Sequence, residues 1–222
     1  MKQLAICCPS RNRPQSVRNM IHSALKNSTS DILIYVDEDD EKRVEYFDVS
    51  QDFKDEPRVS VYFGEHVGRG EAINALCKQR REYRMYLVVS DDIEFVRADW
   101  EQQVIAAMDS FGDDIGCVHL ESENGKEYVN WAIVSRTWLD TLGYFNVPSM
   151  TWFCQDSVIQ ILAEALDRIV FIRPQVIHHK IENFPNVMER FHEDVSNFLW
   201  YMVLNFKSDL NKLKEAIRAK SR

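Results

Sequence analysis

The sequence predicts an α/β fold with a mixed, mainly parallel sheet flanked by helices, and three observations support this prediction. Short apolar segments alternate along the chain with segments whose apolar residues recur at helical spacing, a pattern typical of strands joined by crossover helices. The leading apolar segments are continuous rather than alternating, as expected of strands buried on both faces. The length of 222 residues suits one sizeable α/β domain.

The first half of the chain supplies four predicted strands and two predicted helices. Residues 4–8 form an apolar run that ends at Pro9, and residues 17–25 carry apolar side chains at helical spacing after Pro14. Three further strands are predicted at residues 32–36, 59–63 and 86–89. A second helix is predicted at Gly70–Tyr83. Two of these strands stop in acidic residues.

The second half continues the alternation and then changes character. A helix is predicted at 99–108, a strand at 115–120 and a hairpin turn at Asn124-Gly125. Helices at 136–142 and 156–166 follow, and then strands at 169–172 and 176–177. From Phe191 to Ile217 apolar residues recur every three or four positions, which predicts one long amphipathic helix. We therefore expect one domain over residues 1–185 and a helical extension over 186–222. The extension would pack on the domain or on a second copy rather than on a membrane, because its polar face is mixed in charge.

Composition restricts the classes of protein. Lys and Arg total 27 against 35 Asp and Glu, a net charge of −8, so general nucleic-acid binding is not expected. We find neither an apolar run of about 20 residues that would cross a membrane nor a signal-peptide pattern. Five cysteines without CxxC spacing indicate reduced thiols. The sequence thus predicts a cytoplasmic protein without a transmembrane segment.

Acidic residues follow two of the predicted strands. Asp37 and Asp39 come after the second strand, and Asp91 and Asp92 after the fourth. Ligands of open α/β sheets bind at the carboxyl ends of strands, and hard cations such as Mg²⁺ or Mn²⁺ take carboxylate ligands and bridge to phosphates. These residues predict a metal–diphosphate site, with solvated turn residues as the alternative.

The order of the motifs resembles the inverting GT-A glycosyltransferases of the large family-two type over residues 3–182. The segments that carry the resemblance are Ile6–Pro14, Ile34–Asp39, Gly68–Asn74, Tyr86–Asp92, Trp131–Arg136, Leu142–Phe145 and Phe153–Asp156. The resemblance implies a GT-A fold and transfer of a sugar from a nucleoside-diphosphate sugar, commonly a UDP-sugar, to an acceptor hydroxyl with inversion. It also implies Mn²⁺ or Mg²⁺ as cofactor.

The resemblance further implies a role for each matching residue. Asp156 is the expected catalytic base, and Asp92 and His178 are the expected metal ligands. Strand alternation points only one of His178 and His179 inward, and of the two we prefer His178. The expected donor-binding residues are Pro9, Ser10, Arg11, Asp37, Arg69 and Asp91. Trp131 and Trp152 could stack on a sugar, and His66 receives no role.

Two departures from the family pattern leave alternatives open. Ser90 stands where an Asp is common in the metal motif, and Gln155 replaces the first acid of the Glu-Asp pair that precedes the catalytic helix. A catalytically degenerate nucleotide- or partner-binding domain is therefore the main alternative. A sugar-phosphate nucleotidyltransferase is less consistent, because the loop 9–13 has basic residues but no glycine. Self-association through the C-terminal helix is a further expectation.

Overall fold

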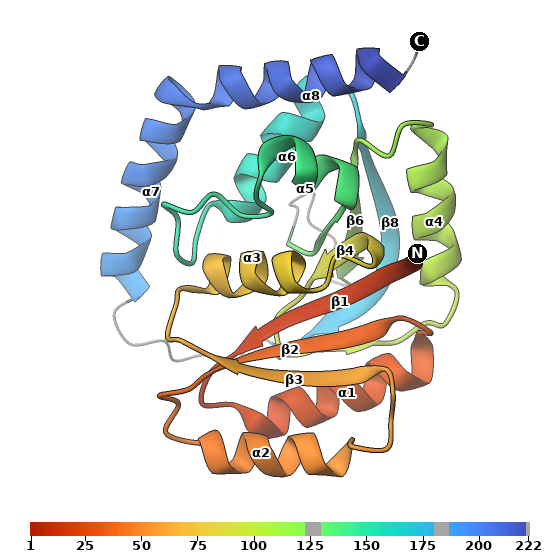
Figure 1. The fold of residues 1–222 in the computed structure, drawn as a ribbon, viewed down its shortest axis with the longest axis vertical. Helices are drawn as coiled ribbons and strands as arrows, with labels where there is room; N and C mark the ends of the chain where they lie inside the picture. Colours follow the sequence, from red (N-terminus) through yellow and green to blue (C-terminus); the bar gives the residue numbers. More distant parts are fainter. Residues whose placement is uncertain (123–129, 180–186, 221–222) are drawn as a thin grey trace.

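The structure, a computed structural model, describes residues 1–122, 130–179 and 187–220. In these residues one eight-stranded sheet runs through the molecule, in the order β3-β2-β1-β4-β7-β6-β8-β5 (Figure 1). Its strands are β1 (Lys2–Ser10), β2 (Asp31–Asp37), β3 (Val59–Gly64), β4 (Tyr83–Val88), β5 (Ile93–Phe95), β6 (Cys117–Ser122), β7 (Ala132–Ser135) and β8 (Ile169–His178).

The sheet is mixed and mainly parallel, which confirms the predicted fold class. Strands β3, β2, β1 and β4 are mutually parallel, and β6 is parallel to β8. The antiparallel members are β7, between β4 and β6, and β5, which pairs with β8. The helices are α1 (Pro14–Asn27), α2 (Arg43–Asp52), α3 (Arg69–Gln79), α4 (Trp100–Ser110), α5 (Arg136–Leu142), α6 (Gln155–Ala165), α7 (Val187–Leu204) and α8 (Phe206–Lys220).

Two hydrophobic cores lie on opposite faces of the sheet. On β1 the side chains of Ala5 and Cys7 enter one core and those of Ile6 and Cys8 enter the other, all fully buried. The first core packs under α3, α5, α6 and the C-terminal helices, and the second under α1, α2 and α4 (Figure 1). Burial on both faces is the reason why the strands are continuous apolar runs.

The predicted helix Gly70–Tyr83 is too long at its carboxyl end. Helix α3 ends at Gln79, and Tyr83 begins β4 instead. Tyr83 is fully buried with its ring against that of Tyr86, and its hydroxyl hydrogen-bonds Asp31 at the start of β2. Tertiary contacts of this side chain with the sheet outweigh the helical spacing of the local sequence.

Several short elements were not predicted. Strands β5 and β7 have three and four residues, too few to show a period. Helix α2 buries Tyr46 and Val49 but exposes Val44 and Phe47, so its apolar residues form no single stripe. The two predicted strands at 169–172 and 176–177 are one strand, β8. The predicted turn at Asn124-Gly125 lies outside the described residues.

The C-terminal tail is two helices rather than one. Helices α7 and α8 meet at Asn205 and run along two sides of the molecule (Figure 1). The tail packs on the domain: Tyr201 and Leu213 are buried in the first core, and the Tyr144 hydroxyl donates to the buried carboxylate of Asp209. The predicted single helix is wrong, because the chain bends to keep both apolar faces on the domain.

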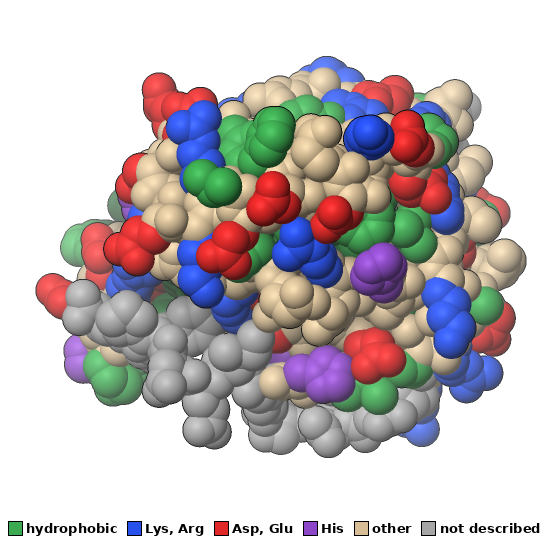
Figure 2. Space-filling view, turned by 90° about the horizontal axis from the view of Figure 1, so that it is seen from below, with side chains coloured by type: hydrophobic (Ala, Val, Ile, Leu, Met, Phe, Trp, Pro, Cys, Tyr) green, Lys and Arg blue, Asp and Glu red, His purple; other side chains and the backbone are tan. Residues whose placement is uncertain are grey.

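None of the helices in the described ranges is long and apolar enough to span a bilayer. On the face shown in Figure 2, acidic and basic side chains are interspersed. Ion pairs are common among the described residues, for example between Arg18 Nε and Asp52 Oδ2 at 2.8 Å.

Candidate active site

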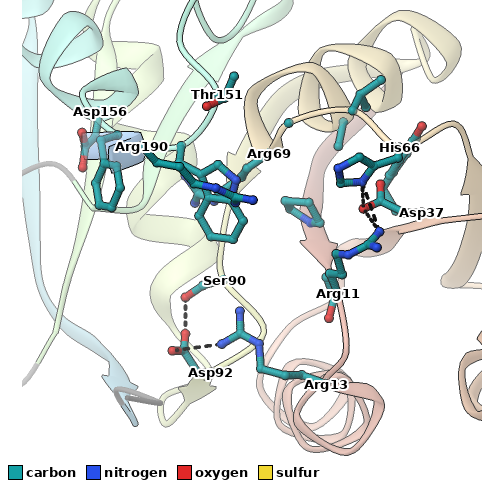
Figure 3. A pocket seen from close by; sticks show the side chains of 18 of the residues that line it. Arg11, Arg13, Asp37, His66, Arg69, Ser90, Asp92, Thr151, Asp156 and Arg190 are labelled. Atoms are coloured by element: carbon teal, nitrogen blue, oxygen red, sulfur yellow. Dashed lines mark hydrogen bonds and ion pairs between the residues drawn. The ribbon is translucent and has the colours of Figure 1, made fainter. Parts of the chain in front are cut away.

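A cavity of about 740 Å³ lies at the carboxyl ends of β1, β2 and β4 (Figure 3). This volume suits a small-molecule ligand. Eight of the nine predicted site residues line it: Pro9, Ser10, Arg11, Asp37, Arg69, Asp92, Asp156 and His178. The strand order explains the convergence, because the carboxyl ends of adjacent parallel strands meet at one edge of the sheet.

One end of the cavity holds a charged cluster around Asp37. Arg11 Nη1 lies 2.8 Å from Asp37 Oδ2 and 2.5 Å from Asp39 Oδ1. The hydrogen bond from Arg11 lowers the pKa of the Asp39 carboxyl. Ligand atoms of Asp37, Asp39 and His66 lie within 4.8 Å of one another, a spacing that could hold a metal ion, and the Arg11 guanidinium offsets one of the two carboxylate charges.

His66 belongs to this cluster, contrary to the sequence interpretation that gave it no role. Its Nδ1 lies 2.8 Å from Asp37 Oδ2. The residue follows β3 by two positions, and β3 is paired with β2, which ends at Asp37. A polar side chain just after a neighbouring parallel strand was the signal that could have identified it.

The other end of the cavity brings Asp92 and His178 together. His178 Nε2 lies 3.3 Å from Asp92 Oδ1, which also accepts a hydrogen bond from Ser90 Oγ at 2.5 Å. Burial opposes ionisation of Asp92, but the hydrogen bonds from His178 and Ser90 outweigh it and lower the pKa of the carboxyl. A carboxylate oxygen and an imidazole nitrogen this close suit a shared Mn²⁺ ion.

The pairing of β5 with β8 decides which histidine faces Asp92. Ile93 is in register with His178, so the end of β8 lies beside the residue that follows Asp92. The side chain of His179 instead contacts Glu94, with 3.0 Å between its Nε2 and Glu94 Oε2. Trp131 supports this arrangement, because it is buried and its ring stands edge-on to His178 with centroids 5.3 Å apart.

Asp91 is the predicted donor-binding residue that does not line the cavity. Its side chain is buried beneath the wall, where Ser10 Oγ donates to Oδ2 at 2.5 Å and Arg13 Nη1 lies 3.2 Å from Oδ1. Burial raises the pKa of this carboxyl to about 6, although Arg13 acts in the opposite direction. Asp91 thus lies behind the cavity wall, in contact with Ser10 and Arg13, which both line the cavity, and its role in donor binding stays a prediction.

Asp156 and Arg69 approach the middle of the cavity from two helix N-termini. Asp156 lies in the first turn of α6 and accepts the N–H of Ser157 at 2.8 Å. Burial raises the pKa of Asp156, an effect that the Ser157 N–H and the nearby charge of Arg69 reduce. Burial lowers the pKa of Arg69, which begins α3. Within the described part of the chain, Arg69 has no carboxylate within ion-pair distance, so its charge faces the cavity.

Helix α7 supplies a wall that the sequence analysis did not foresee. Arg190 and Glu193 line the cavity, and the Arg190 guanidinium lies 5.3 Å from the centroid of the Trp152 ring (Figure 3). This ring face is occupied by a cation, which argues against its use as a sugar-stacking platform. The predicted extension thus belongs partly to the site. Only the fold shows this, because no local pattern links α7 to the strand ends.

Gln155 has a packing function in the place of an acid. It is 3% exposed, and its Nε2 donates to the carbonyl of Met150. A Cβ on Gly70 would collide with this amide and would lie 2.9 Å from the Met150 carbonyl oxygen, so only glycine fits there. Gln155 therefore packs α6 closely against Gly70 of α3, while Asp156 lines the cavity.

Comparisons with known proteins identify the family of the chain. The family model described as glycosyl transferase family 2 matches residues 5–170. The search of curated proteins found no match.

Solved glycosyltransferases share the fold at low identity. The Staphylococcus aureus TarS 1–349 structure with UDP-GlcNAc has a TM-score of 0.63 and 14% identity, over 82% of this chain and 60% of that one. The mannosyltransferase PcManGT from Pyrobaculum calidifontis, in complex with GDP-Man and Mn²⁺, has a TM-score of 0.66 and 11% identity, over 99% and 75%. Glucosyl-3-phosphoglycerate synthase from Mycobacterium tuberculosis, with Mn²⁺, UDP and its product, has a TM-score of 0.65 and 11% identity, over 89% and 79%. This chain thus spans about three fifths of the TarS chain.

Proposed function

Because the chain belongs to glycosyl transferase family 2, we propose that it transfers a sugar from a nucleoside-diphosphate sugar, with a UDP-sugar favoured, to an acceptor hydroxyl with inversion and with Mn²⁺ or Mg²⁺ as cofactor. One observation carries the proposal: Asp92 with His178 and the half-buried Asp156 line one cavity, with the charge of Arg69 between them. A metal–diphosphate site and a base are the two groups that such a transfer needs.

The donor nucleoside would occupy the Asp37 end of the cavity. Asp37 is 7% exposed, so a small part of its carboxylate faces the cavity and can accept an N–H of the base. Arg11 and His66 hold this carboxylate through their hydrogen bonds to Oδ2. Pro9 and Ser10, at the end of β1, form the floor under the nucleoside.

The diphosphate would lie between the Asp92 and Arg69 side chains. Asp92 and His178 would hold the divalent cation, which offsets phosphate charge when bound. Arg69 and Arg190 point into the cavity, and neither has a carboxylate within ion-pair distance in the part of the chain that the structure describes (Figure 3). Two such guanidinium groups stabilise the charge of the leaving diphosphate.

Asp156 would act as the catalytic base. As the acceptor oxygen bonds to the anomeric carbon, its proton passes to the Asp156 carboxylate and the bond to the diphosphate breaks. A single displacement of this kind inverts the configuration. The raised pKa of Asp156 makes the carboxylate a stronger base than an exposed aspartate.

A thermal-shift panel of UDP, GDP, CDP, dTDP and ATP, each with and without Mn²⁺, tests the proposal. A ligand at 100 times its Kd stabilises by about 2.7 kcal/mol, which raises Tm by several degrees. We expect a Mn²⁺-dependent shift with one diphosphate, which Asp92→Ala abolishes while its ligand-free Tm stays near that of the wild type. Binding that survives Asp92→Ala would disprove the metal assignment.

A degenerate binding domain remains the second candidate, because Ser90 reduces the number of carboxylates in the metal motif. Ser90 donates to Asp92 rather than ligating through a charge of its own. Slow release of the diphosphate from the donor, with water as acceptor, distinguishes an enzyme from a binding protein. A shift with ATP alone would favour a nucleotidyltransferase. A cytoplasmic location is part of the proposal, and the five free thiols support it.

A further inference from the structure

A buried carboxylate on α7 holds the loop that forms one wall of the cavity. Asp194 is fully buried, with 0% of its surface exposed. Its Oδ1 accepts the N–H of Thr151, and its Oδ2 accepts the N–H groups of Trp152 and Phe153, each at 2.8 Å. A charge is tolerated at such a buried position because its oxygens are hydrogen-bonded, and three successive backbone donors fix the path of the loop.

The loop leads directly to the proposed base. Trp152 and Phe153 line the cavity, and Cys154 then adopts a left-handed conformation with a φ of 62° before α6 begins. Such a conformation is uncommon for a residue with a side chain and persists only where its surroundings impose it. Asp156 follows in the first turn of α6. The position of its carboxylate therefore depends on the path of residues 151–153.

The same loop is held from its other side by α3. The N–H of Gly70 donates to the carbonyl of Thr151 at 3.2 Å, and a Cβ on Gly68 would lie only 2.9 Å from the Thr151 Cβ. Arg69 lies between these two glycines. Asn197 of α7 adds a further hydrogen bond at the start of the loop, because its Nδ2 donates to the carbonyl of Ser149 at 2.6 Å. The loop is thus held between α3, which carries Arg69, and α7, which carries Arg190.

We propose that Asp194 is a positioning residue for the transfer step. Helix α7, which carries it, is then part of the active site. The inference rests on the proposed function. Asp194 does not line the cavity, so it would touch neither donor nor acceptor. It acts through the loop, by setting where Asp156 stands relative to the anomeric carbon. Donor binding at Asp37 and Asp92 does not depend on this loop, because β2 and the segment after β4 carry those residues.

The test is Asp194→Asn, assayed with the sugar derivative of the diphosphate that binds in the panel and with water as acceptor. The amide turns an N–H toward at least one backbone donor, which loosens the loop without removing volume. We expect kcat for diphosphate release to fall at least about tenfold, since small misplacements of a catalytic group are costly. The Kd of the diphosphate with Mn²⁺ and the donor KM should stay within about threefold of wild type, because the residues proposed to hold the nucleoside and the cation, Asp37, Asp92 and His178, lie outside this loop.

Glu101→Gln is the matched control. Glu101 on α4 is also a buried carboxylate, 5% exposed, and it accepts the N–H groups of Thr29 and Ser30. These residues precede β2, at the opposite end of that strand from Asp37. Both variants should lose stability, whereas kcat should fall only in Asp194→Asn. Asn197→Ala, which removes the outer anchor at less cost in stability, should lower kcat in the same direction.

Three results would overturn the inference. The first is a kcat that falls no further in Asp194→Asn than in Glu101→Gln. The second is a parallel loss of diphosphate affinity, which would indicate general damage rather than positioning. The third is a wild-type protein that binds no nucleoside diphosphate, which would remove the proposed function and this inference together. The first two leave diphosphate binding by the wild type, and hence the proposed function, intact.

Discussion

At the scale of single residues, Asp156 has the side chain on which the proposed chemistry depends most directly. Asp156→Asn keeps the volume and removes the proton acceptor, so the rate of transfer or donor hydrolysis should fall about 10²–10⁴-fold. Diphosphate binding with Mn²⁺ should remain, because the metal-site residues are unchanged. Steady-state kinetics together with calorimetric titration of the diphosphate checks both parts. Transfer at the wild-type rate would show that another group is the base.

The positive charge of Arg69 lowers the pKa of Asp156, the proposed base. Burial raises the pKa of Asp156, and the charge of Arg69 acts against that rise. The base works only when ionised, so the rate falls as pH drops through this pKa. In Arg69→Gln the lowering influence is lost and the pKa rises further, so the acidic limb of kcat should move to higher pH.

The measurement for Arg69 is the pH dependence of kcat at saturating donor. Arg69→Lys is the control, because it keeps the positive charge and should keep the acidic limb near its wild-type position. An acidic limb that moves to lower pH in Arg69→Gln, or that moves equally in both variants, would contradict the electrostatic coupling of Arg69 to Asp156.

At the scale of elements, α8 is an integral part of the first core rather than an appendage. Leu213 is fully buried there, so Leu213→Ala should cost about 2–5 kcal/mol in the free energy of unfolding. Leu204, at the end of α7, is 65% exposed, and Leu204→Ala should change stability by no more than about 0.5 kcal/mol. Denaturant titration measures both. Equal small effects would mean that α8 does not pack on the domain in solution.

Two of the strands that the sequence predicted correctly are buried along their whole predicted length. Residues 4–8 and 32–36 are buried on both faces, so their apolar runs identify β1 and β2 without any knowledge of their neighbours. Helix α2 and strands β5 and β7 escaped prediction because they are short or only partly buried, and their conformations depend on neighbours distant in sequence. The bend at Asn205 is a further case, since continuous helical spacing runs through it.

At the scale of the whole molecule, the sheet order assembles the site from segments that are far apart in the chain. The parallel order β3-β2-β1-β4 places the loops that carry His66, Asp37, Arg11 and Asp92 along one edge. The antiparallel pairing of β5 with β8 then brings His178 to Asp92 from 86 positions later in the chain. Eight predicted residues meet in the cavity because each lies at or just after the carboxyl end of a strand or in the first turn of a helix at this edge.

The sequence by itself determined the strand cores, the fold class and the residues at the strand ends, because uniform burial and strand-end carboxylates leave a local signature. Only the tertiary structure decided that Asp91 turns inward beneath the cavity, that His66 joins Asp37, and that α7 closes the site through Arg190 and Asp194. The physical reason is the same in all three cases. Which side chain reaches a given carboxylate depends on the packing of elements distant in sequence, and that packing leaves no period or motif in the chain.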